Sequence, residues 1–173
     1  YKNKITLTFD DGYISDYEIV FRDLLKNNIL GSFFIVPKYI GKKNYLTWPM
    51  VREMSEHGMN IGSHSLSHKD LTKINADELN IEINDSKKII EDNIGKNIND
   101  FSFPFGKKDI NSLNTVIRSG YENIYISQHG LINEDNIIKP RNSINSKTSY
   151  KSLRSILDPN ILKQFKWKIE DFS

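Results

Sequence analysis

The sequence lacks cysteine, which excludes disulfide bonds, thiolate nucleophiles and thiolate metal ligands. It also lacks any apolar run long enough to cross a membrane, since even its longer apolar stretches, such as residues 31–36, are short. Neither sign of charge is in large excess: the formal net charge is +2, and no basic stripe interleaved with aromatic residues indicates a nucleic-acid partner. We therefore expect neither a membrane span nor a nucleic-acid-binding protein.

No signal peptide is visible either. The chain begins at Tyr1, without methionine and almost directly in a strand-like segment, so we expect a processed or trimmed N-terminus. The missing export signal therefore excludes no compartment. The missing cysteine excludes none either, because a cysteine-free protein persists in oxidising and reducing surroundings alike.

What the sequence contains is an ordinary composition for one globular domain over residues 1–173, with 38% hydrophobic and 27% charged residues. Short strand-like segments alternate with helical ones, without repeats or linkers. The predicted strands cover residues 5–9, 32–36, 59–63, 100–103, 123–127 and, more weakly, 137–144. The predicted helices cover residues 15–27, 48–57, 76–93, 110–119 and 150–157. This alternation predicts an α/β fold of parallel βα units, either closed into a barrel or left open as a doubly wound sheet.

The helix predicted over residues 76–93 has the clearest pattern. Leu79, Ile83 and Ile90 fall on one face of a helix with 3.6 residues per turn. Glu82 falls on another side, so we expect it to lie away from the apolar face.

Unusual polar residues follow the predicted strands at their carboxyl ends. Asp10 and Asp11 follow the first strand, His64 the third, residues 104–106 the fourth, and His129 the fifth. Barrels and open parallel sheets both place their active sites at this end of the strands. The sequence therefore predicts that these residues gather in one site.

Two of the four histidines, His64 and His68, lie four residues apart directly after a strand. Such a pair is more often a surface feature or a helix cap, and an acidic pair such as Asp10-Asp11 more often caps the next helix. Together, at the same end of parallel strands, two neutral imidazoles and one carboxylate would form a metal site with open positions, which is typical of catalytic metals. Adjacent side chains on a strand point to opposite sides, so the second carboxylate stays free to act as a base.

Three segments resemble motifs of one family. Residues 8–12 (TFDDG), 63–68 (SHSLSH) and 101–106 (FSFPFG) resemble, in order, the first three motifs of the polysaccharide deacetylase family, carbohydrate esterase family 4. The resemblance is nearest in style to the biofilm-polysaccharide deacetylase branch. It implies a distorted (β/α)₇-type barrel with parallel strands in a single domain.

The resemblance also implies roles for individual residues. Asp10 matches the family's catalytic base, whereas Asp11, His64 and His68 match its metal ligands. The expected ion is zinc, although cobalt or nickel would suit the same ligands.

A groove wall is implied as well. Pro104 and Phe105 match it, and the backbone N–H of Phe105 is expected to help hold a tetrahedral oxyanion; Ser65 matches a residue that supports the histidine loop. Tyr13 falls near the predicted rim, where it would stack on a sugar ring, although aromatic residues more commonly fill a core.

The chain departs from the family pattern in two places. Ser102 stands where the third motif often has an arginine that orients the base, and Arg141, after the weak sixth strand, is our substitute candidate; a surface arginine is the alternative. The family's late histidine, its general acid, is missing. His129 is a geometric candidate, and the alternatives are water, Asp10 or a group of the substrate.

The function expected from the resemblance is metal-dependent removal of the N-acetyl group from an amino sugar in a glycan, with release of acetate. Two other functions stay open: a metal-bearing glycan-binding domain that has lost turnover, and aspartate-based phosphoryl transfer, which normally needs a spacer between its acids. The resemblance favours the bacterial cell envelope or secretion but leaves the cytoplasm open. The sugar, its linkage and the oligomeric state are not indicated.

Overall fold

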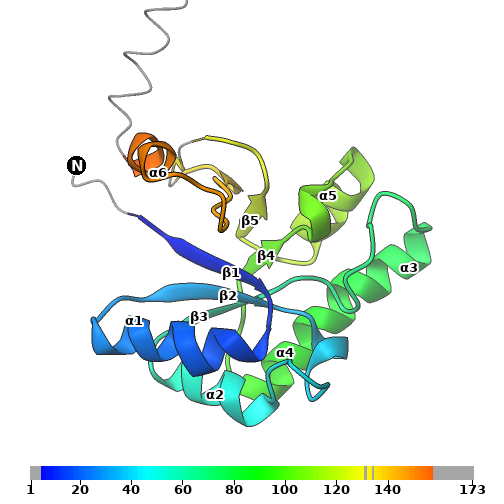
Figure 1. The fold of residues 1–173 in the computed structure, drawn as a ribbon. Helices are drawn as coiled ribbons and strands as arrows, with labels where there is room; N and C mark the ends of the chain where they lie inside the picture. Colours follow the sequence, from blue (N-terminus) through cyan, green and yellow to red (C-terminus); the bar gives the residue numbers. More distant parts are fainter. Residues whose placement is uncertain (1–4, 131, 134, 158–173) are drawn as a thin grey trace, which may run out of the picture.

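The structure is a computed structural model that describes residues 5–130, 132–133 and 135–157 (Figure 1). Its six strands form one sheet in sequence order, and every neighbouring pair is parallel. The strands are β1 (Leu7–Asp11), β2 (Gly31–Ile35), β3 (Asn60–Ser63), β4 (Asp100–Ser102), β5 (Asn123–Ile126) and β6 (Ile138–Pro140). The predicted α/β fold is thus confirmed: the described residues supply six parallel strands of the barrel type, curled into a half-barrel.

Helical segments occupy the connections between the strands. They are η1 (Asp16–Phe21), α1 (Arg22–Lys26), η2 (Pro37–Tyr39), α2 (Trp48–Glu56), α3 (Ala76–Asn80), η3 (Ile81–Asp85), α4 (Ser86–Ile94), η4 (Pro104–Gly106), α5 (Ile110–Arg118) and α6 (Tyr150–Leu157). Helices α1, α2 and α4 cover the outer face of β1–β3 (Figure 1). None of the helices in the described part of the chain is long and apolar enough to cross a membrane.

The core lies between the sheet and these helices. All five residues of β2 are buried, as expected for a parallel strand that is covered on both faces. Phe33 and Ile35 of this strand belong to the same apolar cluster as Ile83 and Ile90 from the helix after β3. The apolar face predicted for residues 76–93 therefore packs on the sheet.

A polar cluster around the buried Asp100 carboxylate connects three strands at their amino-terminal ends. The Asp100 carboxylate accepts hydrogen bonds from Asn60 Nδ2 at 2.6 Å and from Asn123 Nδ2 at 2.7 Å. Because these residues lie on β4, β3 and β5, each bond depends on the register of two strands. The cluster therefore favours one alignment of the sheet, since a buried carboxylate without partners is costly.

The two outer strands of the sheet, β1 and β6, are connected by one side chain. Arg141 follows β6 directly, and its NH1 group donates to Thr8 Oγ1 on β1 at 3.2 Å. The carboxyl ends of the first and last described strands therefore lie close together. This curvature brings residues from the beginning and the end of the chain into one site.

Candidate active site

The polar residues that follow the strands meet at the carboxyl edge of the sheet, as predicted. Asp10 and Asp11 are the last two residues of β1, His64 follows β3, Ser102 ends β4 and Arg141 follows β6. Because parallel strands all end at this edge, residues that are far apart in sequence come within hydrogen-bonding distance.

Asp11, His64 and His68 form a candidate metal site. Their possible ligand atoms all lie within 4.8 Å of one another. Asp11 Oδ1 is 3.2 Å from His68 Nε2 and 3.5 Å from His64 Nε2. The same oxygen is buried and has no hydrogen-bond partner among the described residues. A buried carboxylate oxygen without a partner is costly, and a cation between these three groups would satisfy it.

The state of His64 also suits a metal ligand. Its Nδ1 lies 2.7 Å from the carbonyl oxygen of Ser102, and since a carbonyl only accepts, Nδ1 carries the hydrogen and Nε2 keeps its lone pair. Burial lowers the pKa of His64 and so favours the neutral ring. A neutral imidazole of this tautomer together with a carboxylate is a donor set that suits Zn²⁺ and similar ions. The residues present therefore fit a divalent ion.

A strained loop positions His68. Ser65 and His68 both have left-handed backbone conformations, with φ of 62° and 59°. The loop is held from within by a hydrogen bond from His68 N to Ser65 Oγ at 3.0 Å. From outside the loop, the Glu82 carboxylate accepts hydrogen bonds from Ser67 N at 2.8 Å and from the Ser67 hydroxyl.

Glu82 is 2% exposed, so its expected place away from the apolar face is wrong. The physical reason is the π-helical turn η3, which adds residues to a turn and rotates Glu82 inward. No motif marks this residue. The only available signal was an acidic residue next to the apolar stripe of the helix that follows the histidine loop.

Changing Glu82 to glutamine should loosen the histidine loop. The glutamine Nε2 is a donor, so it cannot accept both hydrogen bonds that Ser67 now donates. Losing a group that supports a ligand typically costs 10–100-fold in metal affinity, and we expect a loss of about that size. A zinc titration of the metal-free protein would measure it, with the exposed Glu56→Gln as the matched control. Equal zinc affinity in the two variants would contradict a positioning role for Glu82.

Asp10 has a different environment from its neighbour. Arg141 donates two hydrogen bonds to it, NH1 to Oδ1 at 2.7 Å and NH2 to Oδ2 at 2.8 Å, and Ser102 Oγ donates a third at 3.2 Å. Burial alone would raise the pKa of Asp10, but the hydrogen bonds from Arg141, the nearby His64, the arginine charge and the hydrogen bond from Ser102 together lower the pKa. Asp10 is therefore an oriented, ionised carboxylate, and His64 Nε2 lies 3.8 Å from it.

Arg141 and Ser102 contact each other as well as Asp10. Arg141 NH2 donates to Ser102 Oγ at 2.8 Å as well as to Asp10. Its guanidinium lies 5.5 Å from the ring centre of Phe34 and 5.9 Å from that of Tyr125, so aromatic rings fix its plane. Arg141 is thus placed against Asp10, and the small Ser102 leaves room for it.

Phe105 forms one wall beside the candidate metal site. Its ring centre lies 4.6 Å from that of His68, and the side chain is 59% exposed, whereas Pro104 is buried. Phe105 and Gly106 both have left-handed backbones, with φ of 58° and 65°. At Gly106 a Cβ atom would come within 2.4 Å of Ser127 Cβ, so this tight turn requires glycine.

Tyrosines stand beside the histidine loop as well. Tyr13 is 44% exposed and stacks on Tyr45 with ring centres 5.0 Å apart. Tyr39 contacts Tyr45 and has its ring centre 6.2 Å from that of His68. Tyr13 therefore belongs to an aromatic cluster beside the histidine loop, together with Tyr45, which no sequence pattern indicated. Its stacking on a sugar ring stays a prediction.

His129 lies on the exposed loop after β5. Its Nδ1 is 2.8 Å from Oδ1 of Asn142, the residue after Arg141, and Asn142 Nδ2 donates to the carbonyl oxygen of Gly130. The contacts described for His129 do not include Asp10, Asp11 or the other histidines. The structure therefore brings His129 to the same edge of the sheet, but against Asn142.

A further buried carboxyl group, Asp16, lies near the two aspartates. Its Oδ2 is buried and has no hydrogen-bond partner among the described residues. Burial, followed by the nearby charges of Asp11 and Asp10, raises the pKa of Asp16 to about 7. Asp16 stands at the start of η1, where an acidic residue looks like an ordinary helix start, so nothing in the sequence indicated its burial.

Asp16 should make stability depend on pH. The folded state holds the Asp16 proton more tightly than the unfolded state, so this group's contribution falls as pH rises from about 4 to about 7. One pKa unit corresponds to about 1.36 kcal/mol. The free energy of unfolding of Asp16→Asn should therefore exceed that of the parent by up to about 4 kcal/mol at pH 8, and by little at pH 4. Urea unfolding at both pH values measures this, with the exposed Asp23→Asn as control. An equal increase in the free energy of unfolding at pH 4 and at pH 8 would contradict the raised pKa of Asp16.

The fold and the site define a class of protein: a parallel α/β half-barrel with an Asp-His-His cluster and an arginine-bound aspartate at the carboxyl edge of its sheet. Comparison with known families assigns the chain within that class. Residues 1–124 match the family model described as polysaccharide deacetylase, so the chain belongs to this family.

Relatives of known name support the assignment. The chain is 31% identical over 125 residues to the peptidoglycan-N-acetylmuramic acid deacetylase PdaA of Bacillus subtilis, which covers 71% of this chain and 46% of PdaA. It is 29% identical over 131 residues to YxkH of the same organism, which covers 76% of this chain and 47% of YxkH. The chain thus spans about half the length of these two curated relatives.

Solved structures share the fold. The Streptococcus pyogenes deacetylase PplD, solved in complex with acetate, has a TM-score of 0.84 and 24% identity, over 92% of this chain and 72% of PplD. IcaB from Ammonifex degensii has a TM-score of 0.81 and 18% identity, over 91% of this chain and 74% of IcaB. These matches confirm the expected fold class.

Proposed function

We propose that this protein is a metal-dependent hydrolase that removes the N-acetyl group from an amino sugar in a glycan and releases acetate. The observation that carries the proposal is the contrast between two adjacent aspartates. Asp11 points an unpartnered, buried oxygen at two imidazoles, whereas Asp10 is fully bonded to Arg141 and Ser102. One is free to bind a cation and the other is held as a base.

Asp11, His64 and His68 would hold the ion, with zinc as the expected metal and cobalt or nickel as alternatives. When bound, such an ion supplies a Lewis acid that polarises a carbonyl group and lowers the pKa of water to about 7. The three protein ligands leave further positions for water and substrate, which is the pattern of catalytic rather than structural zinc sites.

Asp10 is the proposed general base. It accepts a proton from the water that attacks the acetyl carbonyl carbon, and Arg141 keeps its carboxylate oriented during the transfer. The backbone N–H of Phe105 is proposed to donate to the oxyanion of the tetrahedral intermediate, which a main-chain donor can do whatever the side chain. The C–N bond then breaks, acetate leaves, and the amine takes the proton that Asp10 gained.

The proposed substrate is a glycan that contains N-acetylated amino sugars. Phe105 and Tyr39 both contact the His68 ring, and with Tyr13 and Tyr45 they provide aromatic faces for sugar rings. The name of PdaA, a peptidoglycan deacetylase, and the acetate bound to PplD support the same chemistry. A polymer of the bacterial cell envelope is therefore the proposed partner, and the envelope or the cell exterior the proposed location.

The experiment that tests this proposal combines metal analysis with an assay for acetate. The metal-free protein is loaded with zinc, cobalt or nickel, and acetate release is measured on N-acetylglucosamine oligomers and on peptidoglycan fragments. We expect one equivalent of metal per chain and acetate release that a chelator abolishes. Glycan binding without acetate release in the metal-loaded protein would instead identify a glycan-binding domain that has lost turnover.

A further inference from the structure

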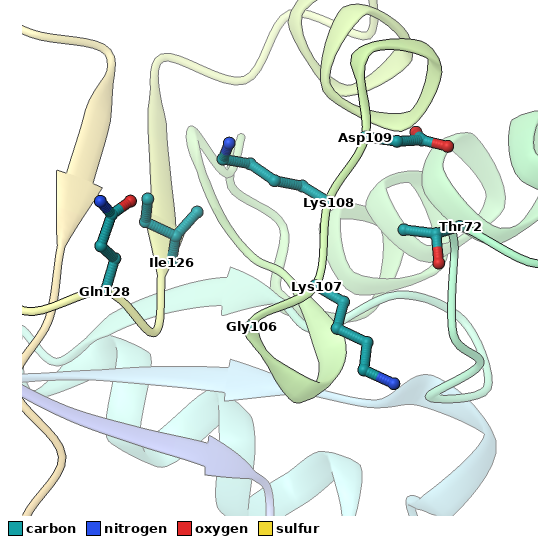
Figure 2. Close-up of a pocket in the computed structure, with 7 residues that line it drawn as sticks. All are labelled: Thr72, Gly106, Lys107, Lys108, Asp109, Ile126 and Gln128. Atoms are coloured by element: carbon teal, nitrogen blue, oxygen red, sulfur yellow. The ribbon is translucent and has the colours of Figure 1, made fainter.

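A pocket of about 480 Å³ lies beyond Phe105, and the proposed mechanism does not use it. Its volume falls within the range of roughly 300–1,000 Å³ that small-molecule sites occupy. Figure 2 shows the residues that line it: Thr72, Gly106, Lys107, Lys108, Asp109, Ile126 and Gln128.

This pocket adjoins the candidate active site through the chain itself. Gly106 lines it and directly follows Phe105, whose ring contacts His68. Asp70, two residues after His68, accepts a hydrogen bond from Lys107 Nζ at 3.0 Å, so the loop that carries the histidine is tied to the pocket wall. The pocket therefore adjoins the candidate metal site through the Phe105–Gly106 turn and through the bond between Lys107 and Asp70.

The two lysines that line the pocket differ in whether an acidic group neutralises them. Asp70 neutralises Lys107, whereas Lys108 has no ion pair among the contacts described and is exposed. Asp109 is ionised, since hydrogen bonds from the Ser112 side chain and backbone lower its pKa. Those bonds hold the carboxylate at the start of α5. In Figure 2 it points away from Lys108, which reaches toward Ile126 and Gln128.

Lys108 and Gln128 therefore face one space from two elements. An ammonium group provides three donors, and the amide of Gln128 provides two more. The wall between them, from Ile126 and the backbone of Gly106, is apolar or uncharged. A group with several acceptor oxygens and a negative charge matches this set of donors better than a neutral hydroxyl does.

We propose that this pocket binds an anionic substituent, a carboxylate or a phosphate, on the sugar next to the one that is deacetylated. The proposal rests on the proposed function and narrows its substrate class from N-acetylated glycans in general to acidic ones. Lys108 supplies the charge, Gln128 a further donor, and the ion pair between Lys107 and Asp70 fixes the wall. Lys108 is thus a residue that determines specificity and takes no part in the chemistry.

The test compares acetate release from matched oligomers that are neutral, that carry a lactyl carboxylate on the neighbouring sugar, or that carry a phosphate there. The variants are Lys108→Glu and Gln128→Ala. The matched control is Lys88→Glu, which changes an exposed lysine on α4 that does not line the pocket. Hydrogen bonds to charged groups are strong enough to change affinity about 10-fold. We expect Lys108→Glu to lower kcat/KM at least 10-fold on the acidic oligomers and to leave the neutral one unchanged.

The preference for acidic oligomers should weaken as salt is raised, because charges at an exposed site are screened. Loss on only the carboxylate or only the phosphate oligomer supports the proposal and identifies the group that is bound. Equal kcat/KM on neutral and acidic oligomers, or an equal effect of Lys108→Glu on both, overturns it. If no oligomer releases acetate, but acidic oligomers bind and Lys108→Glu abolishes that binding, the pocket assignment holds and the proposed reaction is wrong.

Discussion

Replacement of Asp10 by asparagine is expected to lower acetate release by about 10²–10⁴-fold, the usual range for the loss of a general acid–base group. Asparagine keeps the size of the side chain and one acceptor oxygen, so Arg141 and Ser102 retain a partner. It cannot take a proton from water near neutral pH. The loss should therefore appear in kcat, and the affinity for the glycan should change little.

The Asp10→Asn variant should still bind its metal. Asp10 is absent from the cluster of ligand atoms formed by Asp11, His64 and His68, so one equivalent of zinc is expected in the parent and in the variant. The exposed Asp92→Asn on α4 provides a control with the same change of charge and normal activity. Parental activity in metal-loaded Asp10→Asn would remove Asp10 from its role as base.

Most of the fold could be predicted from the sequence because its pattern is local. Alternation of short apolar strands with helical segments identified the six strands of the described residues and their parallel direction. The boundaries were less exact: β1 covers Leu7–Asp11, two residues later than expected at both ends. That shift makes Asp10 and Asp11 the last two residues of the strand, but the expectation that they point to opposite sides is wrong. Asp11 has a left-handed backbone with φ of 78°, which breaks the alternation, and His64 Nε2 lies 3.8 Å from Asp10 and 3.5 Å from Asp11.

In the candidate site too, some features could be predicted from local sequence patterns and others could not. The grouping of His64 and His68 with one aspartate could be predicted from the sequence, because parallel strands end together. The choice of Asp11 as that aspartate came from the family resemblance. The bond between Arg141 and Asp10 joins residues 131 positions apart, across the two outer strands, and the strand before Arg141 is only three residues long. The curvature that closes this distance depends on the packing of the whole sheet, and a local pattern cannot show it.

Residues that support the site escaped the sequence analysis for a related reason. Glu82 turns inward because a π-helical turn changes the period of its helix, and Asp16 is buried by the segments packed on it. Both are acidic residues in helical segments, where exposure is the usual outcome. Their burial comes from tertiary contacts that override the local pattern.

Replacement of Asp11 by asparagine is expected to weaken metal binding, whereas the same change at Asp10 is expected to leave it unchanged. It removes the only carboxylate of the candidate ligand cluster, so zinc affinity should fall by more than about 100-fold, beyond the usual cost of losing a group that only supports a ligand. Acetate release should fall with it. Asparagine suits the position sterically, because Asp11 has φ of 78° and asparagine tolerates left-handed backbones better than most residues.

The metal-free Asp11→Asn protein should be more stable than the metal-free parent. In the parent, Asp11 Oδ1 is buried without a hydrogen-bond partner, whereas an asparagine Nδ2 could donate to the nearby Nε2 of His68 or His64. One such bond is worth about 0.5–1.5 kcal/mol. Zinc at 100 times its Kd should stabilise the parent by about 2.7 kcal/mol and this variant far less.

Thermal unfolding of the parent, Asp10→Asn and Asp11→Asn, each with and without zinc, separates the two roles. The adjacent variants share one chemical change, so each is the control for the other. Zinc should raise the Tm of the parent and of Asp10→Asn, and leave that of Asp11→Asn nearly unchanged. An equal zinc-induced rise in both variants would mean that the ion is bound elsewhere, because Asp11 is the only carboxylate among the described residues whose buried oxygen faces both imidazoles.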